Sequence, residues 1–401
     1  MSLKGNLIIG QSGGPTCVIN ASLAGVISEA KKNPDIGKIY GMNFAIQGVL
    51  GGQLIDLTDS SDDFLEKLKR TPSSALGSSR LKLQESHFPI ILETLKNHDI
   101  RYFHMIGGND SMDTIHRVEK YCKEQGYELR GVGVPKTVDN DLFGTDHTPG
   151  FPSAARYTAL SVMQSGILAR DMQKVDSYVI YQSIGRDAGW LAASAAMAKK
   201  SEEDAPHILL LPERPLNKEK FIAKVKEVYE KVGWVSIACG EGAVWEDGTP
   251  VSASETKDKF GNVEFGAMGG SSVALNIHKL IKSHFPDWRG EFQITESLPM
   301  CGADRSPEID IEEGFSLGEE AVRLASAGES GVMATLIRES DSPYVTKMGT
   351  IPLDRVANET KPIPDEMLSE DGFMVNEKFV EYMRPLIGKL PEYTRIEKKF
   401  V

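Results

Sequence analysis

Two short loops of this sequence contain residue types that could handle a phosphate group. Residues 107–111 (Gly-Gly-Asn-Asp-Ser) offer backbone amides and a carboxylate. Residues 135–141 (Pro-Lys-Thr-Val-Asp-Asn-Asp) offer a lysine, a hydroxyl and two carboxylates. A phosphoryl-transfer centre needs cations around the phosphate and a group that orients or deprotonates the nucleophile. The two loops together predict such a centre.

A third loop, residues 11–16 (Gln-Ser-Gly-Gly-Pro-Thr), stands between a short apolar run and a helical pattern over Cys17–Ala30. A glycine pair lets the backbone approach an anion closely, and the helix that follows offers free N–H groups and its positive dipole end. A lone glycine pair is more typical of a tight turn. Three such loops in one chain favour a phosphate site.

Each of these loops follows a strand-like apolar run: Asn6–Gly10, Tyr102–Ile106 and Gly131–Val134. Parallel α/β sheets bind ligands outside the carboxyl ends of their strands, so neighbouring strands would bring the three loops into one site. Other candidate strands are Tyr178–Tyr181, Ile208–Leu211 and Val235–Ala238. Candidate helices are Phe88–Lys96, Ser153–Ala169, Trp190–Lys199, Lys218–Lys231, Gly270–Ser283 and Leu317–Ser326, and the polar stretch 253–266 reads as a loop. The alternation of strands and helices predicts an α/β fold.

Composition narrows the functional class. A chain of 401 residues is large for one core, so two domains are expected. Its net charge of −12 argues against nucleic acid or an anionic membrane as a partner. The four cysteines form no CxxC pair, the start lacks an apolar signal-peptide core, and no apolar run approaches the length of a membrane span. These features predict a cytoplasmic protein.

Several common catalytic motifs are missing from the sequence. There is no GxxxxGK[ST] loop and no GxGxxG between a strand and a helix, which excludes the usual nucleoside-triphosphatase and nicotinamide-dehydrogenase signatures. The chain also lacks GxSxG and HExxH. Phosphate handling by another architecture therefore remains.

The motifs resemble those of the 6-phosphofructokinase family, in particular its pyrophosphate-dependent branch. Gly13-Gly14 resembles the first phosphate loop, and residues 77–80 (Gly-Ser-Ser-Arg) resemble the segment whose arginine reaches the donor phosphates. Residues 107–111 are similar to the family's GGDGS or GGDDS loop, and residues 135–141 to its PGTIDND or PKTIDND loop. Residues 184–186 (Ile-Gly-Arg) and 240–242 (Gly-Glu-Gly) resemble the MGR element and the strand-end glutamate that holds the sugar.

The resemblance implies two Rossmann-like three-layer α/β/α domains with the active site in the cleft between them. Residues 1–145 and about 300–370 would form the domain that binds the phosphoryl donor. Residues from about 146 to 299 and about 371–401 would form the domain that binds the sugar phosphate. Members of the family are commonly homodimers or homotetramers.

The implied reaction moves a phosphoryl group from pyrophosphate to the C1 hydroxyl of fructose 6-phosphate, reversibly, in glycolysis or gluconeogenesis. Asp139 would be the general base, because a hydroxyl needs a carboxylate to accept its proton at neutral pH. The catalytic residues would be Asp139, Lys136, Arg186 and Thr137. The donor phosphates would contact Gly13, Gly14, Arg80, Lys82, Gly108, Asp110 and Ser111. The sugar phosphate would contact Thr137, Asp139, Asp141, Ile184, Gly185, Arg186, Glu241 and Arg305.

Two residues mark the pyrophosphate-dependent branch, because ATP-dependent relatives have glycine at both places. Lys136 would neutralise the phosphate leaving group, and Asp110 would repel the α-phosphate of ATP. Like unit charges about 4 Å apart cost roughly 4 kcal/mol at an effective dielectric near 20, which corresponds to about a thousandfold. Alternatively, or in addition, Asp110 caps a helix that begins near Met112.

Two departures from the family pattern affect the expected ligands. Asn109 stands where the family has the aspartate that holds magnesium, so either Asn109 is a weaker Mg²⁺ ligand with Asp110 or Asp139 helping, or metal binding relies more on pyrophosphate itself. Residues 297–307 do not match the family's histidine-glutamine-arginine segment, and Arg305 is the candidate for the 6-phosphate. The alternatives are an ATP-dependent 6-phosphofructokinase and a non-catalytic sugar-phosphate-binding regulatory subunit.

Overall fold

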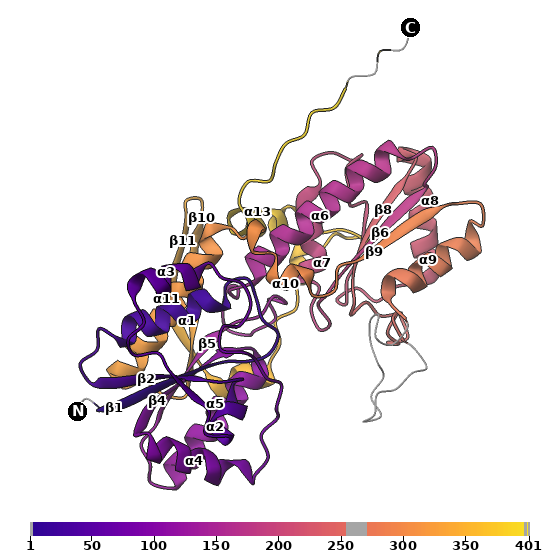
Figure 1. The fold of residues 1–401 in the computed structure, drawn as a ribbon. Coiled ribbons are helices and arrows are strands. Elements are labelled where there is room, and N and C mark those ends of the chain that lie inside the picture. Colours follow the sequence, from indigo (N-terminus) through magenta and orange to yellow (C-terminus); the bar gives the residue numbers. More distant parts are fainter. Residues whose placement is uncertain (1–2, 254–270, 397–398, 400–401) are drawn as a thin grey trace.

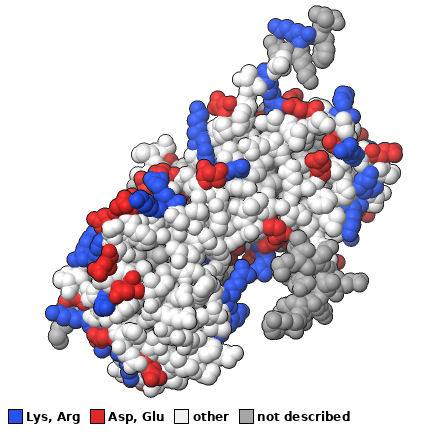
Figure 2. Space-filling view, viewed as in Figure 1, with Lys and Arg blue, Asp and Glu red and all other residues white. Residues whose placement is uncertain are grey.

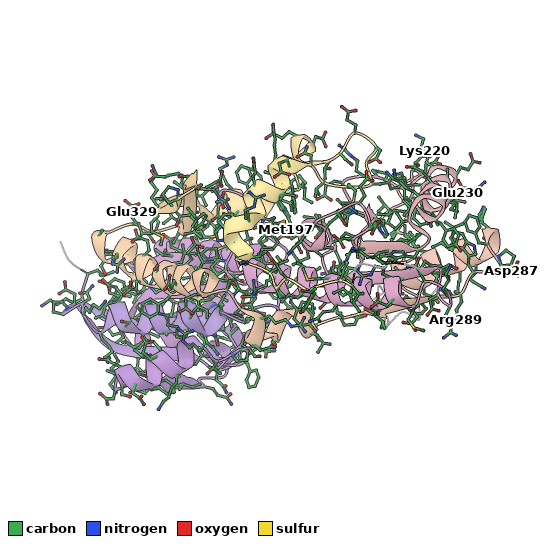
Figure 3. All side chains as sticks on the ribbon, turned by 90° about the horizontal axis from the view of Figure 1, so that it is seen from above. Met197, Lys220, Glu230, Asp287, Arg289 and Glu329 are labelled. Atoms are coloured by element: carbon green, nitrogen blue, oxygen red, sulfur yellow. The ribbon has the colours of Figure 1, made fainter. Side chains whose placement is uncertain are left out.

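The protein is a two-lobed α/β molecule in the computed structural model, which describes residues 3–253, 271–396 and 399 (Figure 1). Seen from above, Glu329 lies toward one end, Asp287 and Arg289 lie at the other, and Met197 lies between them (Figure 3). The predicted loop 253–266 lies almost entirely outside the described residues.

A seven-stranded sheet forms the first lobe, in the order β11-β10-β5-β4-β1-β2-β3. Strands β1, β4 and β5 are parallel neighbours at its centre, and the outermost pairs β2–β3 and β10–β11 are antiparallel. The strand bounds are Gly5–Gln11 (β1), Ile36–Met42 (β2), Leu54–Asp56 (β3), Ile100–Gly107 (β4), Arg130–Pro135 (β5), Val332–Asp341 (β10) and Tyr344–Pro352 (β11).

Helices cover both faces of this sheet, which explains why its central strands read as continuous apolar runs. Leu7 and Ile9 of β1 pack toward α1, α3 and α11, and Ile8 between them packs toward α2, α4, α5 and α12. The helix bounds are Ile19–Ala30 (α1), Ile46–Leu50 (α2), Asp62–Lys69 (α3), His87–Asn97 (α4), Asn109–Glu124 (α5), Glu308–Ala327 (α11) and Leu353–Asn358 (α12).

A four-stranded parallel sheet forms the second lobe, in the order β7-β8-β6-β9. Its strands are β6 (Tyr178–Ser183), β7 (Ile208–Leu210), β8 (Val235–Gly240) and β9 (Gly290–Ile294). One face packs against α6 (Phe151–Asp171), α7 (Trp190–Ser194), the short 3₁₀ helix η1 (Ala195–Ala198) and α13 (Glu377–Ile387). The other face packs against α8 (Lys218–Val232) and α9 (Val273–His284).

Short helical pieces complete the fold: α10 (Leu298–Cys301), η3 (Ala303–Arg305) and η4 (Asp365–Met367). Both lobes are three-layer α/β/α sandwiches, which confirms the predicted fold class. All six predicted strands are present. The helix predicted over Trp190–Lys199 is instead α7 followed by η1, and the helix predicted from Leu317 begins earlier, at Glu308.

The chain passes between the lobes more than once. Helix α6 leads from the first sheet into the second lobe, and the chain returns with α11, which covers the first sheet, before β10 and β11 join that sheet. The chain then runs to α13, which packs in the second lobe against α6. Within residues 3–253 and 271–396, no helix is long and apolar enough to cross a membrane.

Candidate active site

The three predicted phosphate loops meet at the carboxyl ends of β1, β4 and β5. The Ser12 backbone N–H donates to the Ile106 carbonyl (2.9 Å), and the Lys136 N–H donates to the Gly107 carbonyl (3.1 Å). These bonds continue the parallel pairing of the strands past their ends. Neighbouring strands therefore bring the loops together, as their positions in the sequence predicted.

A fourth loop, residues 77–82, closes over the first one. The Gly13 backbone N–H donates to the Ser79 carbonyl (3.2 Å), and the Ser78 hydroxyl donates to the Gly13 carbonyl. Arg80 and Lys82 follow directly and are both exposed, so this pairing holds the cations of the loop beside the glycine pair.

The loops line a cavity of about 460 Å³. Figure 2 shows a hollow between the two lobes, with Lys and Arg atoms along one wall and acidic atoms at its upper edge. Five cations and five carboxylates line the cavity, a balance that differs from the acidic surplus of the whole chain. Among the predicted site residues, the cavity gathers Gly13, Gly14, Arg80, Lys82, Gly108, Asn109, Asp110, Ser111, Lys136, Thr137, Asp139, Asp141 and Arg186.

Asp139 has the electrostatic surroundings of a general base. Burial raises the pKa of its carboxyl to about 7, and the carboxylates of Asp141 and Glu241 push it in the same direction, whereas Arg186 and Lys136 oppose the rise. Its backbone N–H donates to the Thr137 hydroxyl (3.1 Å), which fixes the turn of the loop. A carboxylate whose pKa lies near neutrality can accept a proton without being trapped in its ionised form.

Lys136 is a buried cation, with 3 % of its surface exposed. Its ammonium donates to the Gly14 carbonyl (2.6 Å), so the side chain joins the loop after β5 to the loop after β1. Burial lowers the pKa of Lys136 to about 8; Asp139 and Asp141 counteract this, and Arg80 adds to it. A buried ammonium near neutral pH gains strongly from an anionic ligand, because such a ligand replaces lost solvation.

Asp110 lies in the first turn of α5, on the cavity side. The helix begins at Asn109, Gly108 holds the N-cap position, and no described side chain caps it. The alternative reading, in which Asp110 caps a helix that begins near Met112, is therefore wrong: the chain is already helical at Asn109. The Asp110 side chain is exposed to the cavity.

Asn109 fits the role of a single oxygen ligand. Its Oδ1 atom is buried and has no hydrogen-bond partner among the described residues, and such an atom carries a free-energy cost until a donor or a cation meets it. No group of three or more His, Cys, Asp or Glu side chains in the described part of the chain could hold a metal ion by itself. Mg²⁺ commonly takes only one or two protein oxygens when substrate phosphates supply the rest. Asn109, with Asp110 beside it, matches that type of site.

The loop after β6 forms a further wall of the cavity through Arg186 and Asp187, and the loop after β8 packs against it. Gly185 has φ +112°, a conformation that favours glycine, and a β-carbon there would lie 3.7 Å from Asp139 Oδ1. The Gly242 N–H donates to the Gly185 carbonyl (3.2 Å), and a β-carbon at Gly242 would collide with the Arg186 carbonyl. The two loops are thus locked together beside the base.

Glu241 is half-buried in this wall, and burial raises the pKa of its carboxyl, while Arg186 counteracts the rise. Gly185, Glu241 and Ile184 are not among the described residues that line the cavity itself. Ile184 instead packs against the core of the second lobe.

Arg305 lies outside the cavity, in a neighbouring hollow of about 540 Å³ behind Pro15. Its guanidinium stacks over the Tyr157 ring (4.3 Å to the centroid) and donates to the Ser161 hydroxyl (3.1 Å). These contacts hold it against α6. The structure therefore does not bring Arg305 together with the other predicted residues.

The cavity also includes residues that the sequence did not single out. Asp113, Thr114 and Arg117 extend the α5 wall two turns beyond Asp110, and Asp187 adds a carboxylate beside Arg186. The spacing of these residues could have predicted them from the sequence, because positions three, four and seven residues after Asp110 lie on the same face of the helix. Arg117 also donates to the Leu83 carbonyl (3.3 Å) and so joins this wall to the Arg80 loop.

Comparison with known proteins places this geometry in context. The family model described as Phosphofructokinase matches residues 6–285. A pyrophosphate–fructose 6-phosphate 1-phosphotransferase of Xanthomonas campestris pv. campestris (strain B100) is 38% identical over 396 residues, which cover 97% of this chain and 93% of that protein. The protein of the same name from Halomonas elongata is 37% identical over 389 residues. The alignment covers 95% of this chain and 91% of that protein. The crystal structure of a pyrophosphate-dependent phosphofructokinase from Nitrosospira multiformis superposes with a TM-score of 0.87 at 35% identity, covering 97% of this chain and 94% of that one.

Proposed function

The chain belongs to the phosphofructokinase family, and from this premise we propose that it transfers a phosphoryl group from pyrophosphate to C1 of fructose 6-phosphate. The products are fructose 1,6-bisphosphate and phosphate, and the reaction runs in both directions. Several relatives whose sequences align over almost the whole chain carry the name of this activity.

One observation carries the proposal: a half-buried carboxylate with a raised pKa stands at the junction of two walls that suit two different substrates. The glycine loops and the cations Arg80, Lys82 and Lys136 suit the phosphates of a donor. Gly185, Arg186 and Glu241, which would serve the acceptor, also lie beside Asp139. A base between a donor site and an acceptor site is the arrangement that phosphoryl transfer to a hydroxyl requires.

Asp139 accepts the proton of the C1 hydroxyl as that oxygen attacks the transferring phosphorus. Thr137 and Asp141 orient the base and the acceptor, and Glu241 binds sugar hydroxyls. Phosphoryl transfer spreads negative charge over the phosphate oxygens and the leaving group, so catalysis depends on cations placed in advance. Arg186 faces this charge from the acceptor wall, and Lys136 faces it from the donor wall.

Asn109 and Asp110, together with the donor phosphates, would hold Mg²⁺, and the bound ion would supply positive charge that neutralises part of the donor charge. Asn109 adds no charge of its own, so the site depends more on pyrophosphate than a site built on two carboxylates. This dependence suits a donor that arrives as its magnesium complex.

Donor choice rests on Lys136 and Asp110. The buried Lys136 ammonium stabilises a phosphate leaving group directly, without help from a nucleoside that anchors the donor elsewhere. Asp110 disfavours a third phosphate. Because Asp110 is exposed, solvent screens this repulsion. At the dielectric of water, charges about 4 Å apart repel by roughly 1 kcal/mol, or about fivefold, rather than the thousandfold of a partly buried pair.

Arg305 would reach the 6-phosphate only from the neighbouring hollow, across the loop that holds Pro15. We assign it the outer end of a bound sugar phosphate.

The enzyme works in the cytoplasm as a homodimer or homotetramer, and the division into a donor domain and an acceptor domain follows the residue limits predicted above.

A coupled assay of purified protein with fructose 6-phosphate, Mg²⁺ and either pyrophosphate or ATP tests the proposal. Turnover with pyrophosphate and little with ATP is expected. Preference for ATP would establish the ATP-dependent alternative. No turnover with either donor, together with measurable binding of fructose 6-phosphate by calorimetry, would support the non-catalytic regulatory alternative.

A further inference from the structure

The segment that follows α12 lies directly behind the loop of Asp139 rather than in the cavity. Thr360 forms a β-bridge with Leu142, and the Lys361 backbone N–H donates to the Asp141 carbonyl (2.8 Å). Lys361 is not among the described residues that line the cavity. Lys361 can therefore affect the substrates only through the loop of Asp139.

The Lys361 ammonium is half-buried and donates to three oxygens of one loop. These are Asn140 Oδ1 (3.1 Å), the Thr145 carbonyl (3.1 Å) and the Asp146 carbonyl (2.6 Å). An ammonium has three donors and no acceptor, so these bonds use its full capacity. The side chain thus joins the start of the loop to a point five and six residues later.

Asn140, the residue directly after the base, is held from both sides. Its Oδ1 also accepts from the Thr148 backbone N–H (3.2 Å), and its Nδ2 donates to the Tyr382 hydroxyl (3.2 Å). That hydroxyl in turn donates to the Asp146 carbonyl (2.9 Å). The amide therefore bonds to Lys361 on one side and to α13 on the other.

The backbone of Asn140 explains why such support is needed. Its φ is +56°, in the left-handed region, which residues with a side chain rarely adopt and which asparagine enters more readily than most. Such a conformation persists where the surrounding contacts determine it. The Asn140 backbone sets the direction in which the chain leaves Asp139. Loss of the side-chain contacts of Asn140 would therefore let the Asp139 carboxylate move.

The backbone of Lys361 also reaches the loop of Arg186. Its carbonyl accepts from Trp190 Nε1 (2.9 Å), and its ammonium lies 5.4 Å from the centre of the Trp190 ring. Two residues on, the Ile363 N–H donates to Glu213 Oε1 (3.1 Å), which also accepts from the Gly189 N–H (2.9 Å). One short segment thus contacts the loop of the base and the helix that begins directly after the Arg186 loop.

We infer that Lys361 is a positioning residue, an inference that rests on the proposed function. It fixes the turn after Asp139 and keeps that turn in a fixed position relative to the Arg186 loop. It touches neither substrate. Its ammonium determines the backbone of Asn140, and its carbonyl determines the position of Trp190 relative to that loop. A misplacement of about 1 Å at a reacting group can cost on the order of a hundredfold in rate.

The test compares Lys361→Met with Lys199→Met. Methionine keeps an unbranched stem of similar length and removes the ammonium. Lys199 is a matched control, because it is also half-buried and donates to two carbonyls, those of Glu202 (3.0 Å) and Asp204 (2.8 Å), away from the cavity. Both variants should lose a similar amount of thermal stability. Only Lys361→Met should lose kcat, by about ten- to a hundredfold, with KM for pyrophosphate within about threefold of wild type.

Hydrogen exchange supplies a readout that does not depend on activity. Lys361→Met should speed amide exchange in residues 137–148, and Lys199→Met should not. If the Lys361 variant keeps the wild-type kcat or the wild-type exchange pattern, the inference is overturned. If wild-type protein does not use pyrophosphate, the proposed function fails, while the exchange comparison still decides the positioning role.

Asn140→Gly provides a second variant in case Lys361→Met folds poorly. Glycine accepts the positive φ without strain, yet it removes the amide that Lys361 and Tyr382 hold. Its kcat should fall in the same way, and the double variant should be no slower than the worse single one, because both changes remove the same contact. Losses in kcat that multiply in the double variant would contradict a shared role.

Discussion

The donor wall and the acceptor wall of the cavity are assembled in different ways. The donor wall consists of loops that follow adjacent parallel strands of one sheet, where Ser12 bonds to Ile106 of β4, and of the loop 77–82 between α3 and α4, where Ser79 bonds to Gly13. The acceptor wall has one such pair, the Gly185 and Gly242 loops after β6 and β8. Its remaining predicted member, Arg305, sits in a separate hollow, against α6. The groups at strand ends therefore lie close to one another, whereas Arg305, which lies outside both sheets, is separated from them.

Asp139 stands where the two walls meet, so its replacement should have the largest effect. Asp139→Asn removes the proton acceptor and keeps the shape of the side chain. The expected loss in kcat is about 10²–10⁴, the usual contribution of a general base, with little change in KM for either substrate. Steady-state kinetics of a variant with a wild-type melting temperature measures this. A near-normal kcat would remove Asp139 from the mechanism.

Arg186 tests how firmly the acceptor wall is fixed. Its backbone is locked by the close approach of Gly242, and its exposed side chain lines the cavity. Arg186→Ala should lower kcat/KM for fructose 6-phosphate on the order of 10²-fold, as expected when a transition-state cation is lost. The melting temperature should stay close to that of wild type. A large loss of stability with an unchanged rate would indicate a structural ion pair instead.

The pH profile tests the joint electrostatics of the two walls. Burial raises the pKa of Asp139 to about 7 and lowers that of Lys136 to about 8. The base must be ionised, so kcat/KM should fall about tenfold per unit as pH drops below about 7. Lys136 must be protonated, so kcat/KM should also fall as pH rises above about 8. In Lys136→Met the alkaline limb should vanish while the acid limb remains; an unchanged alkaline limb would mean that another group sets it.

The strand-end loops of the donor wall could be predicted from local patterns in the sequence. Three apolar runs each end in a polar loop, and parallel pairing brings those loops together. The start of α11 could not be predicted in this way, because its first turns are rich in acids, yet Asp310 is buried and accepts from the Gly150 and Ser153 N–H groups. A pattern of apolar residues cannot show a polar group that is buried for its hydrogen bonds.

Lys361 shows the same limit over a longer distance. More than 200 residues separate it from Asn140 in the sequence, and no local pattern distinguishes it from other lysines on the surface. Arg305 is the opposite case, since the sequence suggested a ligand where the structure shows a side chain stacked on Tyr157. Residue type alone cannot predict which partner a flexible cation finds in the fold.

Donor discrimination should respond modestly to a change at Asp110, because the side chain is exposed. Asp110→Gly should raise kcat/KM for ATP relative to that for pyrophosphate by about fivefold, the size of a screened repulsion. Lys136→Gly should chiefly impair pyrophosphate use. Since both residues face the same phosphates, their effects should not simply add. Specificity constants for both donors in each single variant and in the double variant test this, and unchanged ATP use in folded Asp110→Gly would mean that cavity shape excludes ATP.

Replacement of Arg305 should give the smallest effect. The size of that effect bears most directly on the difference between the donor wall and the acceptor wall. Its guanidinium already has two partners, the Tyr157 ring and the Ser161 hydroxyl, so a bound phosphate would have to compete with them. Arg305→Ala should therefore raise KM for fructose 6-phosphate by only about two- to fivefold and leave kcat unchanged, as expected for a partly solvated ion pair worth about 0.5–1 kcal/mol. Arg305→Lys keeps the charge but loses the planar stacking, and should fall between the two. A rise in KM of a hundredfold or more would show that Arg305 leaves Tyr157 when the sugar phosphate binds. The acceptor wall would then be completed by the substrate itself, whereas the donor wall is already in place before any ligand arrives.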